Sequence, residues 1–256
     1  MRNNATLIGL AGSGLALALL ATPATAETAP AFDPPIKVVE LPPSGIPGTG
    51  DAVSCTYYAD ALVRISGVDT PAPDNALIVP LIAGKPLPNC GRPAPSRGIE
   101  LQSGASNLVG RKGNFLVFQY VDQVSAGYFT IFDVQTGKAL FNDGILKGFT
   151  SVALSRGMLQ LGYNRGVNAT CSLYSDRTGC WGELLAKGKI PHDAFSGPPS
   201  IETCKKSYGS DLPADHRSPD LDDDPSIVSY DAALTLDSKG HAMVRPVGTL
   251  HCDPES

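Results

Sequence analysis

The residues with the clearest potential for chemistry form an acidic cluster near the C-terminus: Asp211, Asp215, Asp220, Asp222, Asp223 and Asp224. Asp220-x-Asp222-x-Asp224 has the alternation that places carboxylates around Ca²⁺, and Asp231 falls at the twelfth position of such a loop. The sixth position, however, is Pro225 where a Gly is needed for the sharp turn, and Asp231 is shorter than the usual bidentate Glu. We therefore interpret Asp220–Asp224 as a solvated acidic loop and predict no metal site.

The four histidines, His192, His216, His241 and His251, show no metal-ligand spacing. We expect His241 and His251 to lie on the solvent face of C-terminal strands. The exported part of the chain has no G-x-S-x-G nucleophile motif and neither of the Gly-rich nucleotide-binding motifs. These patterns predict no cofactor, and they favour a protein that is not an enzyme.

Paired carboxylates are the remaining catalytic possibility, because two of them at a suitable separation can hydrolyse glycans. Seven acidic residues are available, and no spacing selects two of them: Asp69, Asp74, Glu100, Asp122, Asp133, Asp143 and Glu183. A hydrolase that acts on envelope glycan or peptide is therefore kept as the alternative function. Asn168-Ala169-Thr170 also matches a glycosylation acceptor, which matters only in a eukaryotic secretory route.

Six cysteines suggest disulfides, because their number is even and no C-x-x-C metal or redox motif occurs: Cys55, Cys90, Cys171, Cys180, Cys204 and Cys252. We predict Cys55–Cys90 in the N-terminal part, Cys171–Cys180 across a short hairpin, and Cys204–Cys252 at the C-terminal strand. The main rival pairs Cys180 with Cys204. Tyr57, Tyr58 and Trp181 lie beside cysteines, and we expect them in packed corners rather than on an exposed stacking platform.

The elements that must position these residues are short β-rich runs separated by turn residues, a pattern typical of all-β domains. The predicted strands are Cys55–Tyr58, Leu62–Ser66, Leu77–Ile82, Ile99–Gln102, Asn114–Val121, Tyr128–Val134, Ala139–Phe141, Thr150–Leu154, Met158–Tyr163, Ala169–Tyr174, Ile227–Leu236, Ala242–Val247 and Leu250–Cys252. Cys180–Gly188 is the one predicted helix, and Ser196–Pro225 is predicted to be a long surface loop.

The most regular part is Gly113–Tyr163, which we predict to be an antiparallel meander with turns at Asp133–Lys138 and Asn142–Gly144. Residues 115–118 are apolar on both faces, which predicts a strand covered on both sides. Phe129–Phe141 resembles the strand–turn–strand of some β-propeller blades, but no second copy occurs. The predicted fold is an antiparallel sandwich or irregular barrel with long loops and disulfides, with propeller-like meanders as the alternative.

The N-terminus reads as an export signal. Arg2 precedes an apolar stretch, and Ala24-Thr25-Ala26 matches an A-x-A cleavage site. The predicted organisation is a signal peptide over 1–26, a Pro/Gly-rich arm over 27–53 and a single all-β domain over 54–256. Within the arm, only Ile36–Leu41 has the composition of a strand.

The net charge and the predicted location of the protein restrict the classes of partner that it can bind. The 20 basic residues include Arg2, so cleavage leaves 19 basic against 25 acidic residues, which argues against nucleic acid. No later stretch is long and apolar enough to predict membrane insertion after cleavage. We predict a periplasmic or secreted, non-catalytic binding or structural protein of the bacterial cell envelope, whose partner is an envelope protein or a glycan.

Overall fold

The structure is a computed structural model that describes residues 31–42, 52–67, 75–91, 98–101, 106–121, 125–209 and 221–255. The acidic residues Asp211, Asp215 and Asp220, the predicted signal peptide and much of the predicted arm lie outside these ranges.

Three antiparallel sheets contain the strands of the described residues, and the strands of each sheet follow one another in the chain. The N-terminal sheet contains β1 (Lys37–Leu41), β2 (Val53–Tyr57), β3 (Ala61–Ser66), β4 (Asn75–Pro80) and β5 (Ile99–Leu101). The central sheet contains β6 (Asn107–Lys112), β7 (Phe115–Tyr120), β8 (Gly127–Asp133) and β9 (Ala139–Ile145). The C-terminal sheet contains β10 (Gly148–Ser155), β11 (Met158–Asn168), β12 (Ser226–Leu236) and β13 (Ala242–Pro254).

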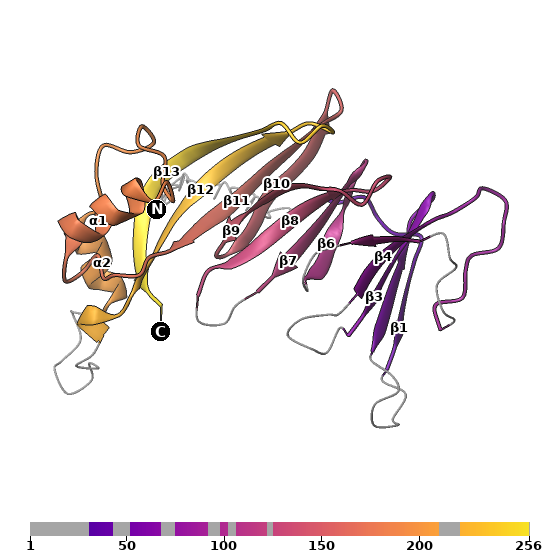
Figure 1. The fold of residues 1–256 in the computed structure, drawn as a ribbon, viewed down its shortest axis with the longest axis horizontal. Coiled ribbons are helices and arrows are strands. Elements are labelled where there is room, and N and C mark those ends of the chain that lie inside the picture. Colours follow the sequence, from indigo (N-terminus) through magenta and orange to yellow (C-terminus); the bar gives the residue numbers. More distant parts are fainter. Residues whose placement is uncertain are drawn as a thin grey trace, which may run out of the picture.

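The sheets stack face to face in chain order, with the central sheet between the other two (Figure 1). Phe115 and Val117 of β7 pack against the C-terminal sheet, and Leu116 and Phe118 pack against the N-terminal sheet. Alternate residues of a strand point to opposite faces, so a strand in a middle layer is apolar throughout. The predicted two-sided burial is therefore confirmed, and so is the all-β antiparallel fold. The described sheets form open layers, and none of them closes into a barrel.

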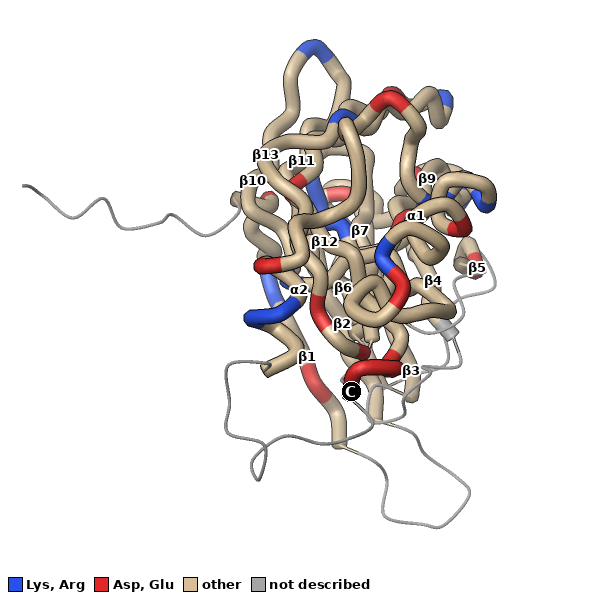
Figure 2. The backbone as a smooth tube through the Cα atoms, turned by 90° about the vertical axis from the view of Figure 1, so that its left-hand side faces the viewer, with Lys and Arg blue, Asp and Glu red and all other residues tan. Residues whose placement is uncertain are grey.

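Two apolar clusters outside the stack complete the core. Cys55, Tyr57 and Cys90 lie in a cluster on the outer face of the N-terminal sheet, where the Tyr57 hydroxyl donates to the Pro88 carbonyl at 2.7 Å. At the far end of the C-terminal sheet, helices α1 (Arg177–Ala186) and α2 (Ile201–Ser207) enclose a second cluster with Trp181 inside it. Lys and Arg are interspersed with Asp and Glu around these helices (Figure 2), and one such pair is Glu183–Lys187.

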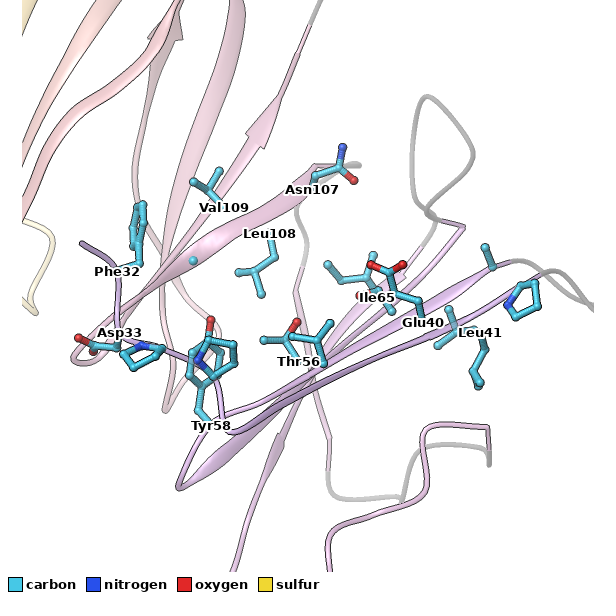
Figure 3. Close-up of a pocket in the computed structure, with 18 of the residues that line it drawn as sticks. Phe32, Asp33, Glu40, Leu41, Thr56, Tyr58, Ile65, Asn107, Leu108 and Val109 are labelled. Carbon is cyan, nitrogen blue, oxygen red and sulfur yellow. The ribbon is translucent and has the colours of Figure 1, made fainter. Parts of the chain in front are cut away.

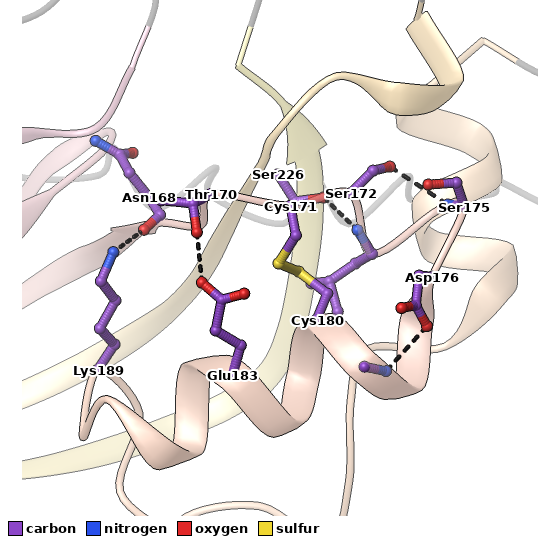
Figure 4. The surroundings of a disulfide bond; sticks show 12 residues. Asn168, Thr170, Cys171, Ser172, Ser175, Asp176, Cys180, Glu183, Lys189 and Ser226 are labelled. Atoms are coloured by element: carbon purple, nitrogen blue, oxygen red, sulfur yellow. Dashed lines mark hydrogen bonds between the residues drawn. A yellow bond between two sulfur atoms is a disulfide. The ribbon is translucent and has the colours of Figure 1, made fainter.

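The predicted disulfides are all present: Cys55–Cys90, Cys171–Cys180 and Cys204–Cys252. The predicted hairpin between Cys171 and Cys180 is wrong. Residues 169–174 form no strand, and Cys180 lies within α1, whose N-terminus is capped by the Asp176 carboxylate accepting from Gly179 N–H (Figure 4). A capped helix start satisfies N–H groups that a hairpin would have paired across strands.

Two further predictions of local secondary structure were also wrong. The predicted loop Ser196–Pro225 contains α2, which begins after the capping residue Ser200 and has Glu202 in its first turn and Lys205 and Lys206 in its last. The predicted turn Asn142–Gly144 is instead part of β9, where the Asn142 side chain donates to the Thr130 hydroxyl of β8 at 2.8 Å. The Asp133–Lys138 turn is confirmed, with Gly137 at φ 67° and the Asp133 carboxylate accepting from Thr136 N–H at 2.8 Å.

The described part of the N-terminal arm is packed and does not behave as a linker. Phe32 lies against Gly110 of β6 and meets Phe149 of β10 edge-on, with ring centroids 6.2 Å apart. The arm then crosses to the N-terminal sheet, where residues 37–41 form its edge strand β1, as the composition of Ile36–Leu41 indicated. The arm therefore ties all three layers together.

Candidate binding groove

The acidic cluster is not assembled into a metal site in the part of the chain that the structure describes. Asp231 lies in β12, and its carboxylate accepts from the Asn164 side chain at 3.1 Å. Asp222 and Asp224 lie at the η2 turn (Leu221–Asp223) and just after it, where their backbone carbonyls accept from Ser172 and Tyr208. Among the described residues, no group of three or more His, Cys, Asp or Glu side chains is placed to hold a metal ion.

The described carboxylates that could serve a hydrolase lie apart: Glu100 is exposed on β5, and Asp133, Asp143 and Glu183 have separate structural partners. Asp133 caps a turn, and Glu183 accepts from Lys187 at 2.5 Å on the surface of α1. Asp143 is nearly buried and accepts from Arg165 at 2.9 Å and from the Tyr163 hydroxyl at 2.6 Å. Asp69, Asp74 and Asp122 lie outside the described residues.

The Asp143 cluster joins the central and C-terminal sheets. The guanidinium of Arg165 also donates to the Tyr230 hydroxyl. Burial, followed by the charge of Asp143, raises the pKa of Tyr163, and burial likewise raises the pKa of Tyr230. Both phenols are fully buried. The cluster is therefore a satisfied interlayer network, in which every charged group has a hydrogen-bonding partner.

The histidines and aromatics lie largely where the sequence placed them. His241 and His251 are exposed, and the His241 ring lies 2.8 Å from the Asp237 carboxylate in the β12–β13 turn. Tyr57, Tyr58 and Trp181 are buried, which confirms the packed-corner interpretation. The Asn168 side chain bonds both backbone polar groups of Ala126, at 2.9 and 3.2 Å, so the amide of the acceptor sequence is already engaged.

An open groove of about 1060 Å³ lies between the N-terminal and central sheets. Its walls are the inner face of β1 and β2 on one side and β6 on the other (Figure 3). Phe32, Asp33 and Tyr58 lie at one end of the groove, and Asn107, Glu40 and Leu41 lie toward the other (Figure 3). We call this feature the intersheet groove.

A charged contact between the two sheets lies beside Tyr58, at one end of the groove. Arg111 at the end of β6 makes a bidentate ion pair with Asp60 in the β2–β3 turn, and its guanidinium lies 5.4 Å from the ring centroid of Tyr58. The hydrogen bond from Arg111 holds the pKa of Asp60 below its ordinary value. Asp33 adds a second link, since it accepts from Gly113 N–H at 2.7 Å and pairs with Lys112. These contacts hold the two walls at a defined separation.

The walls combine apolar and polar side chains. Val38 and Val109 line the groove with 51% and 37% of their surface exposed, and Ser54 and Thr56 of β2 add hydroxyl-bearing side chains to the lining. Glu40 is exposed and makes no ion pair with any described residue. The groove is therefore an open surface of mixed polarity.

Sequence reasoning missed most of this site. The strand β6 was not predicted, because Gly110 interrupts its pattern and a bulge at Val109 shifts its register with β7. The signal available in the sequence was Gly113, immediately before the predicted strand at Asn114–Val121. In the structure this glycine forms a tight turn with φ 56°. An apolar pair, Leu108-Val109, lies on the other side of that turn at hairpin spacing.

No protein-family model, curated protein or solved structure matches this chain. The fold and groove define a disulfide-stabilised, three-layer antiparallel β protein with an open groove between two of its layers. No helix in the described ranges is long and apolar enough to cross a bilayer. Three disulfides are typical of proteins that work outside the cytosol.

Proposed function

We propose that the chain is an exported, non-catalytic binding protein of the bacterial cell envelope, and that it holds its partner in the intersheet groove. The observation that carries this proposal is the groove itself. It is large and open, its walls are held by Arg111–Asp60, and exposed valines line both sides of it. The disulfides and the A-x-A sequence at residues 24–26 support the envelope location.

Export is tested by fractionating cells that express the full chain with a C-terminal tag. We expect the tagged protein outside the cytoplasm, with an N-terminus at Glu27 and no free thiol. A cytoplasmic product that retains residues 1–26 would contradict the proposed location.

Binding is tested with the exported protein as bait for envelope proteins and for purified envelope glycan. Val38→Arg places a long cation in the groove, and Val247→Arg on β13 is its matched control, because both valines are 51% exposed. We expect a partner that, after purification, binds the wild type and the control but not the Val38 variant. Equal binding by all three proteins would overturn the groove as the site.

A further inference from the structure

The intersheet groove has the position of an additional strand of the central sheet. The inner faces of β3 and β4 are covered by the central sheet, through Val63, Ile65 and Ile78. The inner faces of β1 and β2 line the groove, because β6 is the last strand of the central sheet among the described residues. A strand placed beside β6 would therefore lie over Val38, Glu40, Ser54 and Thr56.

The N-terminal arm of the chain already pairs with one end of the outer edge of β6. Asp33 N–H donates to the Arg111 carbonyl of β6 at 2.8 Å, so the extended arm forms a backbone hydrogen bond with the edge. Farther along the same edge, Asn107, Leu108 and Val109 line the open groove. Edge strands present unpaired backbone groups that can accept a further strand.

We propose that the groove binds an extended polypeptide segment of a partner protein, added as a strand to β6 over the inner face of β1 and β2. This inference rests on the proposed binding function and specifies its ligand. Strand addition draws affinity from backbone hydrogen bonds and specificity from alternate side chains.

The charge of the groove selects among such segments. Its described lining includes the carboxylates of Asp33 and Glu40 and no Lys or Arg. Asp33 is already paired with Lys112, whereas Glu40 is exposed without an ion-pair partner among the described residues. The preferred segment carries a Lys or Arg opposite Glu40 and apolar side chains toward Val38 and Leu108.

The test uses the disulfide-bonded exported protein and a fluorescent peptide, Ser-Lys-Thr-Val-Thr-Lys-Ser, whose lysines and valine share one face of an extended strand, as Val38 and Glu40 do in β1. Matched peptides replace both lysines with glutamate or methylate alternate backbone nitrogens. We expect the lysine peptide to bind at least about tenfold more tightly than either match. Glu40→Gln should weaken its binding about threefold to tenfold, and Val38→Arg should abolish it, while Val247→Arg has no effect.

Hydrogen exchange of β6 supplies the independent readout. In the free protein, those amides of Asn107–Val109 that point away from β7 should exchange quickly, and the lysine peptide should slow them. Slow exchange without peptide would show that the chain fills its own groove, and this would overturn the inference.

The two proposals fail in different ways. A purified partner that needs the groove, together with no binding of any peptide, would overturn strand addition and leave the binding function standing. Binding of a glycan, and of no protein, in the groove would also overturn strand addition and leave the binding function standing. Equal affinity for the lysine and glutamate peptides would overturn the selection by Glu40.

Discussion

At the level of single residues, two glycines decide how closely the central and C-terminal sheets approach. A Cβ on Gly144 of β9 would lie 2.1 Å from the carbonyl oxygen of Gly166 in β11. A Cβ on Gly166 would lie 2.6 Å from the Cβ of Ala126. This backbone contact lies beside the buried Asp143–Arg165 pair, so both sheets meet there without intervening side chains.

Gly144→Ala should therefore be strongly destabilising. The new methyl group can be accommodated only if the strands separate, and overpacking of this kind costs about 1–3 kcal/mol. Gly182→Ala in α1 is the control, because nothing lies within 4 Å of its Cβ position, and it should stabilise by about 0.5–1 kcal/mol. Urea unfolding of the three proteins measures both effects, and equal stability of the two variants would contradict the close approach.

The Tyr163 phenol should make stability depend on alkaline pH. Its pKa is raised, so the stability linked to its neutral form is complete below the ordinary tyrosine value of about 10 and is lost as the pH rises above it. Tyr163→Phe removes the donor to Asp143 and should cost about 1–3 kcal/mol at pH 7. The difference from the wild type should shrink above about pH 10, which denaturant titrations at several pH values would measure. A difference that is constant with pH would contradict this.

At the level of elements, the arm and the helical end show how irregular segments complete a β stack. The arm brings Phe32 to the edge of the central sheet and supplies β1 to the N-terminal sheet. Helices α1 and α2 close the far end of the C-terminal sheet over a small core, and each is tied by one disulfide. Both segments cover apolar surface that the sheets alone would expose.

Phe32→Ala should destabilise the fold by about 2 kcal/mol, because the ring is partly buried against Gly110 and Phe149. Ile36→Ala in the same arm should change stability by less than about 0.5 kcal/mol, since Ile36 is 64% exposed. Thermal melts followed by circular dichroism compare the two. A larger loss for the Ile36 variant would argue against the packed arm.

The disulfides should differ in their stabilising effect according to the chain length that each one closes. Cys204 and Cys252 are separated by 48 residues, and Cys171 and Cys180 by 9. Chain-entropy arguments give about 4 kcal/mol for the longer loop and about 2.5 kcal/mol for the shorter. Paired Cys→Ser variants of each bond, unfolded in urea, test the order, and a larger loss from the shorter loop would reverse it.

At the level of the whole molecule, the central sheet shares a core with each neighbour, and these two shared cores join the three layers. This organisation predicts that residues 54–256 unfold as one cooperative unit, in line with the predicted single domain. Calorimetry should give one transition with equal calorimetric and van't Hoff enthalpies. A separate transition for the N-terminal sheet, located by hydrogen exchange, would contradict it.

The sequence by itself determined the local features of this protein. Alternation and turn residues identified most strands, since side chains alternate across a strand and Gly137 permits the positive φ of its turn. The apolar run at residues 115–118 revealed the middle layer, and the spacing of the cysteines predicted their pairing.

Only the tertiary structure decided the rest, because those features depend on contacts between distant segments. Asn142–Gly144 reads locally as a turn, yet pairing with β8 and the approach of Gly166 keep it extended. The groove likewise needs β1 with Val38 and β6 with Val109 to line one hollow, although these residues are more than seventy positions apart in the sequence. The periodicity of apolar residues in the sequence cannot predict this arrangement, because it depends on how whole sheets stack.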